Sequence, residues 1–211
     1  MPSLRARQAA ASAVKAFLAE VAAVFLGKVY DHKNDGFGRK LWAITLAHFD
    51  NRCAYCLVPS TALPKGVRMT MEHLIEENQY QCGLHHPGNT VPACSACNGS
   101  RDKAFDGSRL TWQQHLQNLG KAKKWTASTI EKRRKHIQDF VDHGGYPKLT
   151  SEEMKYLQTT AQALYQDILK RSTAGAKGFI AIHGEVAVRV KTQSSPAPKK
   201  GPPSSRVNPS S

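Results

Sequence analysis

Two cysteine pairs with the same spacing constrain this chain more than any other feature. Cys53 and Cys56 form one C-x-x-C pair, and Cys94 and Cys97 form a second. Each pair lets a tight turn direct two thiolates at one ion, and two such turns complete the tetrahedral set that structural zinc prefers. In a reducing compartment, paired cysteines are more often metal ligands than disulfides. The repeated spacing therefore predicts one structural zinc site, and a redox protein without zinc is the alternative.

The charge balance indicates the kind of partner. The 211 residues include 30 Lys and Arg against 16 Asp and Glu, a net charge of +14. Such an excess favours a polyanion, either nucleic acid or a membrane surface. A soluble basic protein without such a partner has the same composition.

The N-terminal segment is apolar, but charges interrupt it. Residues 9–26 follow Arg5 and Arg7, as in a signal peptide, yet the segment contains Lys15 and Glu20. A membrane span needs about 18 residues with few or no charges. We therefore expect a cytoplasmic protein that does not cross a membrane.

Periodicity and composition divide the chain into four parts. Apolar residues at three- and four-residue steps predict an N-terminal helical segment over 1–47, with helices at 10–25 and 41–49. Residues 48–106 hold all five cysteines. Residues 107–172 predict helices that begin at Thr111, at Ser128 and after Thr150. The last part, 173–211, contains a possible hairpin, 179–182 with 186–190, and then a disordered basic tail rich in Ser, Pro and Lys.

Between the cysteine pairs, the pattern predicts two strands and a helix. Residues 67–72 alternate apolar and polar side chains, which is typical of a half-buried strand. A polar loop over 75–88 leads to a short strand at 90–93, which Pro92 restricts to an edge or to its last position. Residues 96–104 fit a short helix. The order is strand, loop, strand, helix, with the zinc site at the outer ends.

Three short motifs occur in order in this segment: Glu72-His73, Gly88-Asn89 leading into Val91-Pro92-Ala93-Cys94, and Cys94-Ser95-Ala96-Cys97-Asn98. Together they resemble the HNH nuclease family in its four-cysteine, zinc-bound form, and Asn98 stands where the family name has His. The resemblance implies a ββα-metal fold that hydrolyses phosphodiesters to 5′-phosphate and 3′-hydroxyl ends. It also implies that Asn89 holds the catalytic loop and orients His73.

The residue chemistry fits that activity. Neutral imidazole at His73 is suited to activate water. Glu72 and Asn98 offer hard oxygen ligands that suit Mg²⁺ or Mn²⁺, and Asp102 is a candidate third ligand one helical turn after Asn98. In a regular strand Glu72 and His73 point to opposite faces, so the strand must end or bulge there.

Four further residues receive lesser roles. Arg101 is a candidate contact for phosphate. We expect His85 and His86 to be exposed loop residues and Cys82 to be a buried or loop thiol outside the zinc set.

A basic surface follows the cysteine-rich segment. Phosphate contacts raise affinity for DNA without selecting its sequence. The candidate contacts are Lys121, Lys123, Lys124, Lys132, Arg133 and Lys135.

The sequence thus predicts a mainly helical α+β protein with a zinc-stabilised ββα-metal core between N- and C-terminal helices. The expected function is a metal-dependent DNA endonuclease that acts on double-stranded DNA. A non-catalytic, zinc-stabilised nucleic-acid-binding module is the alternative. Restriction, phage packaging, homing and toxin action all use this core, and the flanking segments favour none of them.

Overall fold

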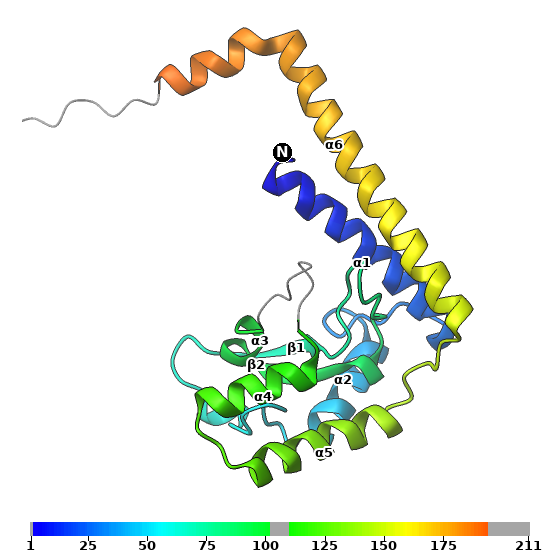
Figure 1. Ribbon diagram of the computed structural model, residues 1–211, viewed down its shortest axis with the longest axis vertical. Helices are drawn as coiled ribbons and strands as arrows, with labels where there is room; N and C mark the ends of the chain where they lie inside the picture. The colour runs from blue at the N-terminus through cyan, green and yellow to red at the C-terminus, as the bar shows by residue number, and fades with distance from the viewer. Residues whose placement is uncertain (1, 102–109, 194–211) are drawn as a thin grey trace, which may run out of the picture. The chain divides into compact units, whose positions relative to one another are not determined.

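The computed structural model describes residues 2–101 and 110–193, and it is mainly helical with one small sheet (Figure 1). The chain divides into two compact units, 1–170 and 171–211. The α-helices are α1 (Leu4–Leu26), α2 (Gly36–His48), α3 (Ser95–Gly99), α4 (Trp112–Ala122), α5 (Ala127–His143) and α6 (Ser151–Gln193). Short 3₁₀ turns occupy Ser60–Ala62 and Pro87–Asn89, and the strands are β1 (Met69–His73) and β2 (Thr90–Cys94). The predicted mainly helical α+β class is confirmed.

The sheet and the helix that follows it occur in the predicted order. Strands β1 and β2 pair antiparallel, with Met69 opposite Cys94 and His73 opposite Thr90. Helix α3 begins directly after Cys94 and ends at Gly99, so it is shorter than the predicted 96–104. Residues 102–104 of that prediction lie outside the described part of the chain. Since α3 contacts both strands, the three elements form one small unit.

Side-chain caps decide where the flanking helices begin. Thr111 and Gln114 form a capping box at the start of α4, and Thr150 forms the equivalent pair with Glu153 before α6. The predicted Ser128 start of α5 is wrong, because Thr126 accepts a hydrogen bond from the Thr129 amide and the helix begins earlier. Asp35 likewise caps α2 through the Gly38 amide, so this helix begins at Gly36 rather than near residue 41.

Helix α1 packs against the first part of α6. Val14 and Leu18 are completely buried in one apolar cluster with Leu157 and Ala161. By length and composition α1 is also long and apolar enough to cross a membrane, with a mean hydropathy of 1.8. A core helix has these same properties. The buried stripe gives α1 a packing role within residues 1–170.

A second apolar cluster surrounds the cysteine pairs. It joins the cysteines to both strands and to helices α4 and α5. Its members include Phe49, Tyr55, Leu74, Val91, Trp112, Leu116, Ile137 and Phe140. The zinc-ligand candidates therefore lie inside the core and not on a surface finger.

The second unit is helical where it is described. The possible hairpin over 179–182 and 186–190 is wrong, because these residues belong to α6, which ends at Gln193. Gly184 lies between the two segments of the predicted hairpin, but one glycine costs a helix only about 1 kcal/mol relative to alanine. The predicted tail from residue 194 lies outside the described residues.

Candidate metal centres

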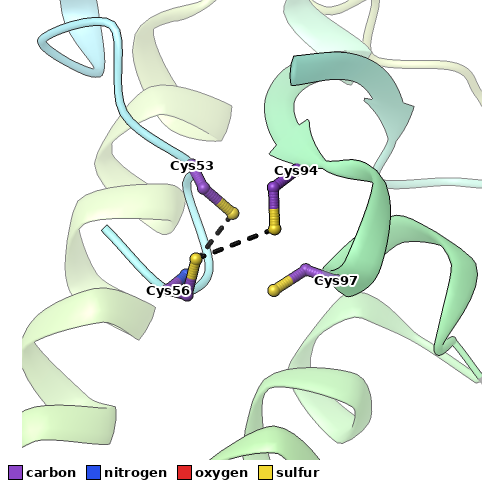
Figure 2. Close-up of side chains that lie close together, drawn as sticks. All are labelled: Cys53, Cys56, Cys94 and Cys97. Atoms are coloured by element: carbon purple, nitrogen blue, oxygen red, sulfur yellow. Dashed lines mark hydrogen bonds between the residues drawn. The ribbon is translucent and has the colours of Figure 1, made fainter. Parts of the chain in front are cut away.

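The two cysteine pairs, Cys53 with Cys56 and Cys94 with Cys97, face each other and form one cluster (Figure 2). Their sulfur atoms all lie within 4.8 Å of one another. Cys53, Cys94 and Cys97 are buried, and Cys56 is half-buried. The structure thus brings together the four residues that the spacing selected, close enough to bind one zinc ion.

Backbone hydrogen bonds position the two pairs. The Cys53 amide donates to the Val58 carbonyl and the Ala54 amide donates to the Pro92 carbonyl, which joins the first turn to β2. Cys94 ends β2 and Cys97 lies on α3, so the second pair spans the strand-to-helix junction. Both turns present their thiols to the same point.

The thiol geometry and charge fit zinc. Zn–S bonds of about 2.3 Å give a tetrahedron whose edges are about 3.8 Å. The sulfur atoms of Cys56 and Cys94 are 3.8 Å apart. The hydrogen bond with Cys56 raises the pKa of Cys53 to about 12 and contact with Cys53 raises the pKa of Cys97, whereas the same pairing lowers the pKa of Cys56. Thiolates this close together repel one another, and a bound zinc ion would offset that repulsion.

The fifth cysteine has a different environment. Cys82 is fully buried in the cluster that joins α1 to α6, and burial raises its pKa to about 11. The prediction of a buried thiol outside the zinc set is confirmed.

A second cluster of metal-binding side chains surrounds His73. Nε2 of His73 lies 2.9 Å from Nδ1 of His85 and 3.3 Å from a carboxylate oxygen of Glu77. The other Glu77 oxygen lies 3.1 Å from Nδ1 of His85. All three side chains are mostly buried, with 9% to 19% of each exposed. The expectation that His85 and His86 are exposed is wrong, since His86 is also buried.

Burial controls the charge state of this cluster. Desolvation lowers the pKa of His73 to about 4, so its imidazole is neutral at pH 7. Burial alone would raise the pKa of Glu77, but a hydrogen bond from His85 and the proximity of His73 lower it overall. The cluster therefore presents a neutral imidazole beside a carboxylate.

Asn89 holds the loop that carries Glu77 and His85. Its Nδ2 donates to the carbonyls of Ile75 and Leu84, and its Oδ1 accepts from the Ile75 amide. Both ends of the loop are thereby fixed to the residue before β2. The Leu74 amide also donates to the Asn89 carbonyl, so the hydrogen bonding between the two strands continues one residue beyond His73.

Glu72 and His73 are adjacent at the end of β1 and contact different partners. Glu72 is buried, and its Oε1 accepts a 2.8 Å hydrogen bond from Arg101. The Arg101 guanidinium also donates to the carbonyls of His73, Leu74 and Leu110, and its side chain is fully buried. The prediction that Arg101 contacts phosphate is therefore wrong. It neutralises Glu72 and holds the end of β1.

Another predicted ligand of the catalytic ion, Asn98, lies on α3. Nδ2 of Asn98 donates to the Thr70 hydroxyl and to the Met71 carbonyl, which fixes α3 to β1. Asn98 does line a cavity of about 150 Å³ together with Glu72, His73 and Glu77. Asp102 lies outside the described residues.

A larger cavity, of about 690 Å³, is lined by His73, Glu77 and His85. Three exposed basic side chains, Lys15, Lys33 and Arg68, also line it. The basic residues predicted on α4 and α5 are exposed, apart from Arg133, which stacks on the Trp125 ring at 3.5 Å. Lys132 and Arg133 line a different hollow. Among the described residues, basic side chains thus line two separate cavities.

Sequence reasoning missed Glu77, His85 and Lys15 at this site. Glu77 follows His73 by four residues, and His85 lies in a segment that looked like an ordinary polar loop. Asn89 could have indicated these two residues. Because it was expected to hold this loop and to orient His73, residues of the loop must lie near His73. Lys15 comes from α1 and had no local signal.

Comparison of the chain with protein-family models, with curated proteins and with solved structures finds no match.

Proposed function

We propose that the protein is a metal-dependent DNA endonuclease of the HNH type. The observation that carries the proposal is the position of His73, which ends β1 beside cavities that also receive Asn98 from α3 and Glu77 from the loop. The order of two antiparallel strands and a helix, with four cysteines at the strand-to-helix junction, supports it.

The site has the groups that phosphodiester hydrolysis needs. A water oxygen attacks phosphorus, the bond from phosphorus to the 3′ oxygen breaks, and that oxygen leaves with a proton. A 5′-phosphate and a 3′-hydroxyl result. Attack requires activation of water, and a divalent cation would stabilise the developing charge. Neutral His73 is available at pH 7 for the first task.

The charge distribution supports a nucleic-acid substrate. Lys15, Lys33 and Arg68 surround the larger cavity at His73, and the whole chain carries a net charge of +14. Cations beside a hydrolytic centre attract a phosphate backbone irrespective of base sequence. Double-stranded DNA in the cytoplasm is the substrate that we propose.

Nicking of supercoiled plasmid with Mg²⁺ or Mn²⁺ tests the proposal. We expect His73→Ala to reduce the rate by about 10²–10⁴-fold, the contribution of a positioned acid–base group. His143→Ala, which removes an exposed imidazole at the end of α5, is the matched control and should cut like the wild type. If the wild type cuts no better than His73→Ala with any divalent metal, the enzyme hypothesis fails.

The alternative, a zinc-stabilised DNA-binding module, predicts a different pattern. Wild type and His73→Ala would then bind DNA equally well and neither would cut it. The cysteine cluster by itself favours neither function, because structural zinc sites occur in both classes.

A further inference from the structure

We propose that His73, Glu77 and His85 bind a second metal ion, a transition metal distinct from the zinc of the cysteine cluster. Its binding does not depend on the proposed nuclease function. Its catalytic meaning does, because His73 is the central residue of that proposal.

The three side chains form one face of a coordination site. Nε2 of His73 and Nδ1 of His85 are 2.9 Å apart, and they lie 3.3 and 3.1 Å, respectively, from different oxygens of the Glu77 carboxylate. With metal–ligand bonds of about 2.1 Å, the edges of an octahedron are about 3.0 Å and those of a tetrahedron about 3.4 Å. The observed separations are close to these values, and one ligand atom of each residue lies within 4.8 Å of the others. One ion can therefore reach all three groups.

Hydrogen bonds among His73, Glu77 and His85 cannot satisfy all of their facing lone pairs at once. Nε2 of His73 and Nδ1 of His85 face each other and also face the two oxygens of Glu77. A proton on one nitrogen can point at one neighbour, whereas an ion at the centre accepts a lone pair from each group. Convergence of lone pairs in a mostly buried position is the arrangement that metal coordination uses.

Surrounding residues hold the ligands in place. The His85 ring packs against the buried Tyr30 ring, with centroids 5.2 Å apart. Asn89 fixes both ends of the loop that carries Glu77 and His85, and strand pairing fixes His73. Such outer contacts fix ligand orientation and raise metal affinity.

The ligand types select the ion. Two imidazoles with one carboxylate suit Zn²⁺, Mn²⁺, Fe²⁺, Co²⁺ or Ni²⁺, whereas Mg²⁺ prefers oxygen ligands throughout. Three protein ligands leave positions open toward the cavity of about 690 Å³. An ion on Nε2 of His73 would take the lone pair that a general base needs. In the metal-bound protein, the ion rather than the imidazole would then activate water.

Titration of the metal-free, reduced full-length chain with Co²⁺ tests the inference. We expect two equivalents to bind, one with an intense thiolate-to-cobalt absorption band and one without it. His85→Ala and the nearly isosteric Glu77→Gln should each lose the second equivalent and keep the thiolate band, which also shows that the variant folds. His143→Ala should bind two.

Binding of one equivalent by the wild type, or of two by both His85→Ala and Glu77→Gln, would overturn the inference. These outcomes are separate from the nicking result. If the wild type binds two equivalents but does not cut DNA, the nuclease proposal fails and the metal site stands. If it cuts DNA but binds one equivalent, the metal site fails and the nuclease proposal stands.

Discussion

Nε2 of His73 lies 2.9 Å from Nδ1 of His85, although one residue ends a strand and the other belongs to the loop that follows it. The contact exists because Asn89 draws both ends of the loop toward the sheet. The contact places His85 of the loop in the cluster around His73 of the strand. Several consequences can be measured.

The cysteine cluster should determine stability. Cys94→Ser removes one thiolate, and we expect loss of the cysteine-bound zinc together with several kcal/mol of unfolding free energy, since structural zinc contributes roughly 10–16 kcal/mol in small finger peptides. Zinc content and thermal unfolding give the two readouts. Cys82→Ala is the control, because this buried thiol lies outside the cluster. Equal zinc loss in both variants would contradict the assignment.

The buried ion pair of Arg101 and Glu72 should contribute more to the free energy of unfolding than the exposed pair of Arg134 and Glu131. Arg101→Leu removes the cation that lies 2.8 Å from the buried Glu72 carboxylate, and breaking a buried ion pair costs about 3–5 kcal/mol. Arg134→Leu breaks the exposed pair with Glu131 and should change stability little. Urea unfolding measures both. Similar effects of the two substitutions would show that Glu72 does not depend on Arg101.

Asn89 should control the order of the loop. Asn89→Ala removes three hydrogen bonds at once, and each buried group left without a partner costs about 1–3 kcal/mol. We expect faster amide exchange over residues 75–84 and weaker metal binding at His85. Asn118→Ala, on the exposed side of α4, should leave exchange in that loop unchanged. Unchanged amide exchange over residues 75–84 in Asn89→Ala would show that Asn89 does not hold the loop.

Lys15 should contribute to DNA binding through charge. It is exposed and lines both cavities at His73. For Lys15→Ala we expect weaker binding and a slope of log affinity against log salt that is smaller by about 1. Glu20→Ala on the same helix removes the opposite charge and should not weaken binding. An unaltered slope in Lys15→Ala would place the DNA elsewhere.

His86 should make stability depend on pH. Burial lowers its pKa from 6.5 to about 4, so below pH 6.5 the unfolded chain gains a proton that the folded protein does not. This contribution is present above pH 6.5 and is lost as the pH falls toward 4, by up to about 3 kcal/mol.

His86→Asn keeps an acceptor for the Gly88 amide, which His86 bonds through Nδ1, but it does not titrate. The difference in unfolding free energy between the two proteins should therefore shrink from pH 7 to pH 4. A constant difference would show that His86 titrates normally in the folded protein.

The sequence alone determined the features that depend on near neighbours. Repeated C-x-x-C spacing identified the four cysteines, because a tight turn fixes the distance between two thiols whatever surrounds it. Alternation identified β1, and local capping identified the starts of α4 and α6. The hairpin predicted over 179–182 and 186–190 was wrong, because these residues continue α6 and the single Gly184 between them costs a helix only about 1 kcal/mol.

Only the tertiary structure decided which side chains surround His73. Lys15 comes from the first helix, Glu77 and His85 come from the loop, and Arg101 follows α3. The sequence suggested that Arg101 contacts phosphate, yet its burial beside Glu72 makes it a structural residue. The polar composition of residues 75–88 suggested that His85 is an exposed loop residue, yet it lies beside His73. Long-range packing changed both roles, because a charge or a lone pair takes its meaning from the groups that face it, and sequence spacing does not specify those groups.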